Sequence, residues 1–407
     1  MPEPHTLIIG ASHAGSQAAV SLRQAGYGGR ITLLGEEEVA PYHRPPLSKD
    51  YLSGDRDEAD ILLRPAESYS EHDIALRLGV RAGAIDRANK TVQTEDGDAL
   101  LYDNLILATG ARARPLPIEG ADLPNVFYLR NTADVDAIRA RVRPGKRAVI
   151  IGGGYIGLET AASLRQRGMA VTLLEAQPRI LQRVTSERMS DFYRRVHTEE
   201  GVEIIESCIA SSIVANGDTL SVRTSCDRSW DAHMIVIGIG VLPNIELAEF
   251  AGLDIGDGIA VNEYCQTTDP DIYAIGDVSW HHNDFYDRDV RLESVPNATE
   301  QAKTVARHIT GAAKPYDALP WFWSDQFDLK LQIAGLSDGH DDIVVRGDPE
   351  TSRSFAAYYF KGETLLAVDA VNAPRDFMLA KMALSKGRTL DKATLSDPDA
   401  DLKSAMV

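Results

Sequence analysis

Two segments of the chain show the same order of hydrophobic and polar positions. Each opens with a β-branched run, at residues 6–9 and 149–151, and continues through a glycine-containing turn into an amphipathic helical pattern. A glycine suited to a helix C-cap follows, and a second β-rich run then covers residues 30–35 or 170–175. This order predicts two βαβ units, because parallel strands are usually joined by a crossover helix.

The two segments also repeat each other in sequence. The stretch SLRQAG at residues 21–26 recurs as SLRQRG at residues 163–168, and in both copies its last glycine lies 16 residues after the first glycine of the turn. One glycine-rich turn alone is weak evidence for a nucleotide site. Two turns in phase, each with its strand, helix and cap, are strong evidence. The repeat therefore predicts two dinucleotide sites.

Both turns follow the pattern G-x-G-x-x-G. The second copy begins at Gly152 and has all three glycines, whereas the first begins at Gly10 and carries Ser12 at the middle position. The first glycine makes the tight turn, the second lets the backbone approach a pyrophosphate, and the third allows close helix–strand packing. We expect the β-carbon of Ser12 to crowd the pyrophosphate slightly and its hydroxyl to be able to donate to a phosphate oxygen.

An acidic residue stands at the end of the second strand in each copy. It is Glu175 in the second copy and Glu36 in the first, with Glu37 as a neighbouring candidate. An acid at this position accepts hydrogen bonds from ribose hydroxyls. No arginine directly follows Glu175, so a 2′-phosphate would meet a carboxylate without a compensating cation, which favours NAD over NADP. Arg179 and Arg183 follow at short distance and weaken this inference.

Two further apolar runs end in turns that suit a flavin nucleotide. Residues 102–111 form a strand pattern that ends in small residues, where a chain is able to pass close to a cofactor. Residues 267–277 end in Gly276 and Asp277, and an acid at the carboxyl end of a strand is well placed to bind a polyol chain. Each run alone also fits an ordinary strand and turn. Together they favour a flavin in the first copy.

Composition narrows the class of protein. With 407 residues, 44% of them hydrophobic, the chain fits a globular protein of two or three domains. A net charge of −18 argues against nucleic acid or an anionic membrane as the main partner. No apolar run approaches the roughly 20 residues that span a bilayer. The three cysteines, Cys208, Cys226 and Cys265, form no C-x-x-C pair, so we expect ordinary reduced thiols, a cytoplasmic location and no metal site.

Several blocks of sequence together resemble a known family. They are RPPLSK at 44–49, ATG at 108–110, GGGYIGLE at 152–159, GIGVLPN at 238–244, GD at 276–277, ESVPNA at 293–298 and WFWSDQ at 321–326. On these, essentially the whole chain resembles the flavoprotein reductases of the glutathione reductase fold. Within them it is most similar to the FAD-dependent NADH:ferredoxin reductases that serve bacterial dioxygenases and cytochromes P450.

This resemblance implies an α/β fold with two Rossmann-like dinucleotide-binding domains and a C-terminal α+β domain. The FAD-binding domain is then discontinuous, over residues 1–112 and 244–322. The NAD-binding domain covers residues 113–243 and the C-terminal domain residues 323–407. The final stretch, residues 390–407, is polar and acidic, and we expect it to be loosely held. The basic run at residues 139–147 is expected to be a solvated helix end and connector.

The resemblance also assigns site residues by position. Three residues form the expected catalytic set: Lys49, Glu159 and Trp323. The expected FAD contacts are Gly10, Ser12, Ala14, Glu36, Arg44, Lys49, Ala82, Thr109, Gly110, Arg130, Asp277 and Val295. The expected NAD contacts are Gly152, Gly154, Ile156, Gly157, Glu159, Glu175, Arg183 and Gly238.

By the same resemblance, Lys49 places its ammonium beside the flavin, where a fixed cation stabilises the negative charge that reduction leaves on the ring. A buried ammonium needs a partner, and Glu159 is that partner by analogy. Two interpretations stay open for Trp321 and Trp323. They either cover the flavin edge or the nicotinamide, or they pack in the core.

The positions of the cysteines in the sequence predict which kind of acceptor takes electrons from the flavin. Disulfide reductases of this fold carry a redox cysteine pair just after the first βαβ unit, but the first cysteine here is Cys208. A one-electron acceptor, a [2Fe–2S] ferredoxin, therefore fits best. In relatives the segments around Lys303 and Lys330 lie near the docking surface for such a protein. The alternatives are a rubredoxin reductase, or an NADH/FAD redox sensor similar to apoptosis-inducing factor that acts by partner binding.

Overall fold

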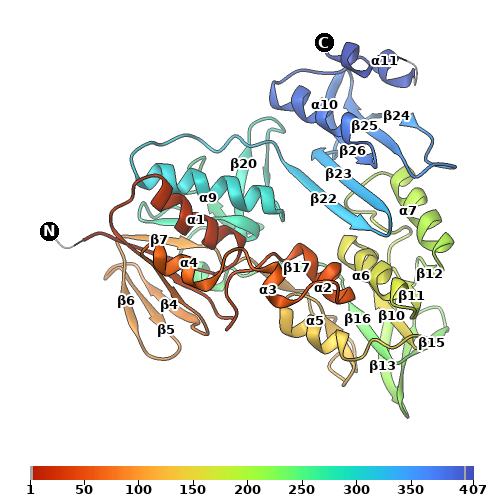
Figure 1. Ribbon diagram of the computed structural model, residues 1–407, viewed down its shortest axis with the longest axis horizontal. Coiled ribbons are helices and arrows are strands. Elements are labelled where there is room, and N and C mark those ends of the chain that lie inside the picture. Colours follow the sequence, from red (N-terminus) through yellow and green to blue (C-terminus); the bar gives the residue numbers. More distant parts are fainter. Residues whose placement is uncertain (1–2, 398–399) are drawn as a thin grey trace. The chain divides into compact units, whose positions relative to one another are not determined.

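The computed structural model describes residues 3–397 and 400–407, and the chain separates into two compact units (Figure 1). Unit 1 contains the chain up to residue 43, residues 61–112 and residues 242–320. Unit 2 contains residues 44–60, 113–241 and 321–407. The short strands β8 (Ala111–Ala113) and β17 (Val241–Pro243) lie where the chain passes from one unit to the other.

Unit 1 is built on a five-stranded parallel sheet. Its order is β19 (Ile272–Ala274), β7 (Asn104–Leu107), β1 (His5–Ile9), β2 (Arg30–Leu34) and β3 (Ile74–Arg77). Helix α1 (His13–Gln24) packs closely against α9 (Val295–Ile309), because small residues such as Ala18 and Ala302 line their buried faces. The central strands are buried on both faces, which explains their continuous apolar runs.

Smaller elements complete unit 1. One three-stranded antiparallel sheet contains β4 (Ala82–Asp86), β5 (Thr91–Thr94) and β6 (Ala99–Leu101). A second three-stranded sheet contains β18 (Ile259–Val261), β20 (Ser279–Asn283) and β21 (Arg288–Val290). The short helices are α4 (Ala66–Glu71), α8 (Glu246–Phe250) and the 3-10 turn η2 (Gly276–Val278).

Unit 2 repeats the arrangement of the parallel sheet. The order is β12 (Val202–Ile205), β11 (Ala170–Leu174), β10 (Arg147–Ile151), β16 (Met234–Ile237) and β9 (Val126–Tyr128). A three-stranded sheet of β13 (Ala210–Asn216), β14 (Thr219–Thr224) and β15 (Ser229–Ala232) accompanies it, as β4–β6 does in unit 1. The helices are α5 (Thr132–Arg139), α6 (Tyr155–Gln166) and α7 (Glu187–Glu199). The segment that starts at residue 44 adds η1 (Pro45–Ser48), α2 (Asp50–Ser53) and α3 (Glu58–Ile61), whose last residue belongs to unit 1. The repeat seen in the sequence is therefore a repeat of whole sheets.

The C-terminal part of unit 2 is an α+β structure. Its antiparallel sheet has the order β22 (Trp321–Gln326), β23 (Leu329–Gly335), β26 (Thr364–Val371), β25 (Phe355–Lys361) and β24 (Asp342–Gly347). Helix α10 (Pro374–Ser385) packs on it, and α11 (Lys392–Ser396) and η3 (Leu402–Ala405) follow. The expectation of a loosely held tail was wrong for its described residues, because Leu395 and Ala405 are fully buried. The predicted α/β class is confirmed.

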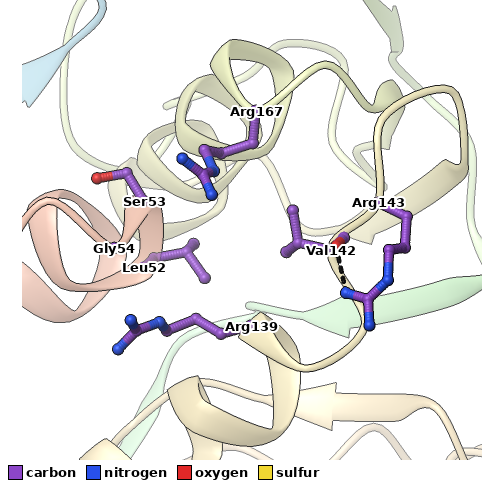
Figure 2. A pocket seen from close by; sticks show the side chains of 7 residues that line it. All are labelled: Leu52, Ser53, Gly54, Arg139, Val142, Arg143 and Arg167. Atoms are coloured by element: carbon purple, nitrogen blue, oxygen red, sulfur yellow. Dashed lines mark hydrogen bonds between the residues drawn. The ribbon is translucent and has the colours of Figure 1, made fainter.

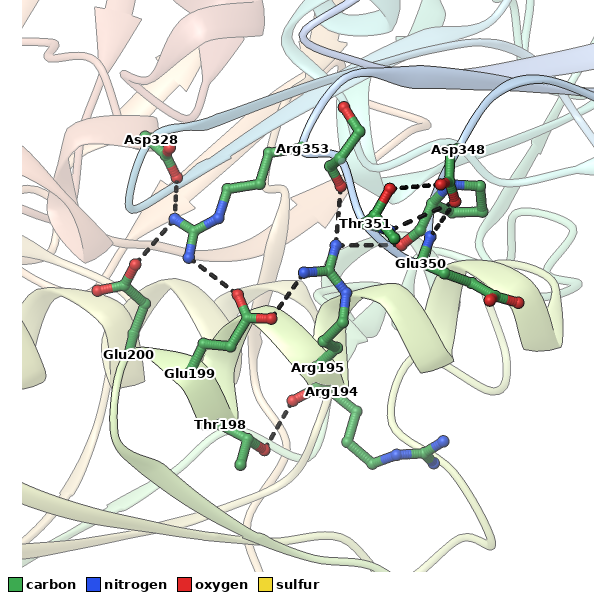
Figure 3. A network of polar contacts seen from close by, with 12 residues as sticks. Arg194, Arg195, Thr198, Glu199, Glu200, Asp328, Asp348, Glu350, Thr351 and Arg353 are labelled. Carbon is green, nitrogen blue, oxygen red and sulfur yellow. Dashed lines mark hydrogen bonds and ion pairs between the residues drawn. The ribbon is translucent and has the colours of Figure 1, made fainter.

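A network of charged side chains ties α7 to the C-terminal sheet within unit 2 (Figure 3). The Arg353 guanidinium lies 2.6 Å from a carboxylate oxygen of Asp328, 3.2 Å from one of Glu199 and 2.8 Å from one of Glu200. Arg195 donates to the carbonyl of Ser352. Because one cation is shared among several acids, the network holds its geometry better than an isolated surface pair does.

Candidate functional site

The first glycine of each turn occupies a conformation that only glycine tolerates. Gly10 has a φ of +113°, and a β-carbon on it would lie 2.1 Å from the Ala108 carbonyl oxygen. Gly152 has a φ of +115°, and its β-carbon would lie 2.3 Å from the Gly238 carbonyl oxygen. In both units the turn therefore packs directly on the end of the neighbouring strand, β7 or β16. This contact places Gly238, a predicted NAD contact, against the second turn.

The middle positions of the two turns show whether the protein itself leaves room for a side chain there. Ser12 and Gly154 are the N-cap residues of α1 and α6, both with extended backbone. A β-carbon on Gly154 would meet no described atom within 4 Å. A side chain is therefore tolerated at this position of the turn, and Ser12 keeps the turn intact. The described first turn of each helix contains no acidic residue, so both positive helix ends suit a phosphate group.

The two predicted ribose-binding acids differ in how they are held. In unit 2, Glu175 accepts hydrogen bonds from the Gly153 N–H, at 2.6 Å, and from the Gln177 N–H, at 2.7 Å. These bonds fix its carboxylate against the glycine turn. In unit 1, Glu36 is exposed, and its carboxylate lies 3.8 Å from the guanidinium of Arg81.

The other predicted FAD contacts of unit 1 gather around strand ends. Thr109 Oγ1 donates to the Asn244 carbonyl at 2.8 Å, and the Asn244 N–H donates to the Gly110 carbonyl at 2.9 Å. A β-carbon on Gly276 would lie 3.0 Å from that of Ala14, which brings the η2 turn with Asp277 to the start of α1. Two further predicted contacts open elements of unit 1: Ala82 begins β4 and Val295 begins α9.

Three predicted FAD contacts belong to unit 2. Arg44 and Lys49 flank η1, and Arg44 Nη1 donates to the Arg130 carbonyl at 2.7 Å. The remaining predicted NAD contacts are also in unit 2. Ile156 is exposed in the first turn of α6, and Arg183 lies beside the strand end that carries Gly238, since its Nη2 would be 3.5 Å from a β-carbon on Gly240.

Lys49 and Glu159 form a buried ion pair in unit 2. Lys49 Nζ lies 2.8 Å from Glu159 Oε2, and the two side chains are 15% and 2% exposed. Two hydroxyls complete the shell of the carboxylate: Ser48 Oγ donates to Oε2 at 2.5 Å and Ser324 Oγ donates to Oε1 at 2.6 Å. A charge pair removed from water is stable only if its remaining hydrogen-bonding positions are filled, and here both carboxylate oxygens are.

Local sequence explains why Lys49 points at Glu159. Pro45 and Pro46 fix the backbone of η1, so Lys49 emerges in a defined direction before α2. Glu159 and Ser163 lie on the same face of α6, four residues apart. Ser163 Oγ donates to the Ser48 carbonyl at 2.7 Å, so the segment is held at two neighbouring points of one helix.

Sequence reasoning missed the roles of Ser48 and Ser324. Both lie inside blocks that carry the resemblance, RPPLSK and WFWSDQ. Serine next to a lysine or a tryptophan gives no signal of its own, because a hydroxyl is common on any surface. Only the packing of β22 beside α6 shows that the two hydroxyls meet the same carboxylate.

Trp323 lies on β22 directly before Ser324 and is half-buried. The ring centres of Trp323 and Trp321 are 5.5 Å apart. The Lys381 ammonium lies over the ring of Trp321, 4.2 Å from its centre. Burial raises the pKa of the next acid along the strand, Asp325, while the charge of Lys49 opposes that rise. Strand β22 therefore carries an aromatic pair, and an acid whose charge interacts with that of Lys49.

A second buried carboxylate lies in the C-terminal sheet. Asp369 on β26 is 2% exposed and accepts hydrogen bonds from Tyr359 OH, at 2.7 Å, and from Thr185 Oγ1. Burial raises its pKa to about 6, although the two hydroxyls act in the opposite direction. The hydroxyls of Tyr155 and Tyr193 are also buried and have no hydrogen-bond partner among the described residues.

A pocket of about 280 Å³ in unit 2 is lined by arginines and by none of the predicted site residues (Figure 2). Arg139, Arg143 and Arg167 surround it, with Gly54 at one side. Arg139 lies 3.6 Å from Asp136 and over the ring of Tyr51. Three residues of the basic run at 139–147, Arg139, Val142 and Arg143, thus line a pocket. In the described part of the chain no group of histidine, cysteine and acidic side chains is arranged to hold a metal ion.

The two predicted docking lysines are in different units. Lys303 on α9 of unit 1 lies 2.7 Å from the carboxylate of Glu300. Lys330 on β23 of unit 2 is exposed, opposite Asp325 in the register of β22 and β23. Within residues 3–397 and 400–407, no helix has the length and apolar character needed to cross a membrane.

Comparison with known proteins agrees with these features. Residues 4–302 match the family described as "Pyridine nucleotide-disulphide oxidoreductase", and residues 321–406 match the family described as "Reductase C-terminal". The chain is 44% identical to rhodocoxin reductase of Rhodococcus erythropolis, across 98% of this chain and 94% of that protein. It is 42% identical to the 5,5'-dehydrodivanillate O-demethylase ferredoxin reductase subunit of a Sphingobium species, across 99% and 98%.

A solved structure shows the same fold along the whole chain. The covalent putidaredoxin reductase–putidaredoxin complex matches with a TM-score of 0.96 and 40% identity, covering 100% of this chain and 98% of that one. The resemblance predicted from the sequence blocks is thereby confirmed. The chain belongs to the pyridine nucleotide-disulphide oxidoreductase family and is an oxidoreductase.

Proposed function

We propose that the protein is an FAD-dependent NADH:ferredoxin reductase. It takes electrons from NADH and passes them singly to a [2Fe–2S] ferredoxin that feeds a cytochrome P450 or a ring-hydroxylating dioxygenase. The observation that carries the proposal is the duplicated glycine turn, with the same backbone geometry on two sheets of the same strand order. Two nucleotide sites in one chain suit an enzyme that moves electrons between two nucleotide cofactors.

The residues present fit both cofactors. FAD is assigned to the Gly10 turn, Glu36 and Asp277, and the family resemblance adds Arg44 and Lys49 as contacts. NAD is assigned to the Gly152 turn, where the main-chain bonds of Glu175 hold its carboxylate ready for ribose hydroxyls. When bound, FAD supplies the exchange between the two-electron chemistry of NADH and the one-electron chemistry of a ferredoxin.

The Lys49–Glu159 pair supplies the fixed charge of the site. We assign to the Lys49 ammonium the stabilisation of negative charge that reduction produces nearby. Glu159 positions that ammonium, and Ser48 and Ser324 hold Glu159 by one hydrogen bond to each of its oxygens. Trp323 is assigned to the cover of the reacting rings by the resemblance of its block, WFWSDQ.

The segment after the first βαβ unit indicates which kind of protein accepts the electrons. Residues 41–50 contain no cysteine, so no dithiol at that position relays electrons to a disulfide substrate. Two of the named relatives are reductases of rhodocoxin and of the ferredoxin of an O-demethylase, and the matching structure is a reductase joined to putidaredoxin. These support an iron–sulfur protein as partner. We further propose the domain boundaries given above and a cytoplasmic location, where thiols stay reduced.

The test of the function uses the purified protein with several acceptors. We expect an FAD spectrum, fast NADH-dependent reduction of ferricyanide, and reduction of cytochrome c that requires an added [2Fe–2S] ferredoxin. Rubredoxin in place of the ferredoxin should support little turnover. Fast reduction by NADH without transfer to any iron–sulfur protein would instead favour a redox sensor.

Cofactor preference is tested by steady-state kinetics. We expect a large preference for NADH over NADPH in kcat/KM, because the 2′-phosphate of NADPH would approach the Glu175 carboxylate. Glu175→Gln removes this charge and should raise kcat/KM for NADPH, while Glu187→Gln, at an exposed position of α7 in the same unit, serves as the matched control. Comparable wild-type rates with the two nucleotides would contradict the assignment.

Ferredoxin docking is tested by charge reversal. Lys303→Glu and Lys330→Glu should each lower kcat/KM for the ferredoxin about 10-fold at low salt and less at high salt, because steering by opposite charge is screened. Turnover with ferricyanide should not change. Lys146→Glu, at an exposed position in unit 2, is the control. An equal loss for Lys146→Glu, or no change for either docking variant, would remove the two lysines from the interface.

A further inference from the structure

Two cysteines that lie 18 positions apart in the sequence meet at the open end of a β-hairpin in unit 2. Cys208 lies just before β13 and Cys226 just after β14. Pairing of Ala210 with Thr224, and the bond from the Ser225 N–H to the Ile209 carbonyl, carry the hairpin register to this end. The two Sγ atoms lie 3.5 Å apart, and both thiols are free.

The two thiols have unequal surroundings. Cys226 is exposed, and its Sγ lies 3.1 Å from Thr224 Oγ1. Cys208 is 2% exposed. Hydrogen bonding by Thr224 and by Cys208 lowers the pKa of Cys226, whereas burial raises the pKa of Cys208. An exposed thiol of lowered pKa beside a protected one is the arrangement of an attacking cysteine and a resolving cysteine.

The pair is connected to the nucleotide turn through the main chain. The Cys208 N–H donates to the Glu175 carbonyl, and the Ser207 N–H donates to the Gln177 carbonyl, both at 2.9 Å. The Gln177 N–H in turn donates to the Glu175 carboxylate. The loop that positions this acid therefore rests on the residues next to the dithiol. Ser207, one of these supporting residues, has a φ of +54°, a left-handed conformation that is uncommon for a residue other than glycine.

We propose that Cys208 and Cys226 form a reversible disulfide when a hydroperoxide oxidises the protein, and that this bond weakens nucleotide binding at the Gly152 turn. The Cys226 thiolate attacks one oxygen of hydrogen peroxide, the O–O bond breaks, and the released hydroxide takes a proton and leaves as water. Cys208 then attacks the sulfenic sulfur, the S–S bond forms, and a second water leaves. Two thiols lose two hydrogens, and the peroxide is reduced to two waters.

Bond formation has a mechanical consequence. A disulfide requires a sulfur separation of about 2.05 Å, so the hairpin end must draw together. Because the Cys208 N–H holds the Glu175 carbonyl, movement of Cys208 changes the position of the acid against the turn. This second part rests on the nucleotide role proposed for Glu175. The bond itself does not depend on it.

The test uses the holoprotein and two readouts. After treatment with hydrogen peroxide and blocking of free thiols, trypsin cuts at Arg223 and separates the two cysteines, so a disulfide appears as residues 196–223 joined to residues 224–228. Calorimetric titration with NAD⁺ then compares oxidised and reduced protein. We expect the joined peptides, and a dissociation constant raised about 5-fold or more and restored by dithiothreitol. Cys226→Ser should show neither effect, and Cys265→Ala should show both.

Different results would contradict the disulfide, its link to Glu175 or the nucleotide site itself. Peroxide treatment that leaves the peptides separate, or that takes Cys226 only to a sulfinic acid, would overturn the disulfide. Joined peptides with an unchanged dissociation constant would overturn the link to Glu175. Protein that forms the joined peptides but binds no NAD⁺ even when reduced would refute the proposed nucleotide site and leave the disulfide established.

Discussion

Lys49→Met is expected to slow reduction of the bound flavin by NADH about 10²-fold, as measured by stopped-flow absorbance. The magnitude is that of removing one fixed electrostatic donor from a site where charge develops. NADH affinity should change much less than the rate, because the glycine turn and Glu175 are untouched. Lys146→Met, which removes an exposed lysine from the same unit, should leave the rate unchanged.

A companion variant separates this charge effect from damage to the fold. Lys49→Met leaves the Glu159 carboxylate buried without its cation, which costs about 3–5 kcal/mol of stability in comparable pairs. The double change Lys49→Met with Glu159→Gln replaces a charged pair by two neutral side chains and should recover most of that stability. The rate of reduction should stay low. Recovery of the rate together with stability would mean that Lys49 is only structural.

Asp369→Asn is expected to change how stability depends on pH. Burial raises the Asp369 pKa from 3.8 to about 6, so the folded state holds this proton at pH values where the unfolded state has lost it. The stability that the proton brings is fully present below pH 3.8 and is lost as pH rises to about 6. The loss is on the order of 3 kcal/mol across this window. Asparagine is neutral throughout, so the variant should gain stability relative to wild type by that amount as pH rises, with no further change above pH 6.

Urea denaturation followed by tryptophan fluorescence measures this difference. Trp230, Trp321 and Trp323 report on unit 2, which contains Asp369. Tyr359→Phe is the matched variant, because it removes a hydroxyl that lowers the pKa of Asp369 and should therefore extend the pH-dependent window upward. A difference between wild type and Asp369→Asn that does not vary between pH 4 and pH 6 would show that the carboxyl is not protonated in the folded state.

The repeated pattern of strand, turn and helix was predictable because each step has a local cause. The close approach of Gly10 to Ala108 excludes any side chain, so glycine must appear in the sequence wherever this turn appears. The strands of the two parallel sheets are apolar because they are buried on both faces. Such constraints act within a few residues of one another, and a single sequence displays them.

The contacts that could not be predicted join residues distant in sequence. Ser324 meets Glu159 across 165 positions, and Thr185 meets Asp369 across 184. Cys208 and Cys226 were interpreted as ordinary thiols because their spacing matches no motif. They meet because a hairpin turns between them, and the register of that hairpin depends on which face of β13 is buried.

Unit 2 is assembled from three separate segments of the chain, which has a consequence for synthesis of the protein on the ribosome. The Lys49 segment is made early, α6 with Glu159 follows, and β22 with Ser324 comes only after all of unit 1 has been translated. Domains generally fold as they emerge, but this unit cannot complete the shell of Glu159 until its last segment is available. The hydrogen-bond shell of the charged pair is thus completed late, and a nascent chain holds Glu159 without one of its three partners for much of its synthesis.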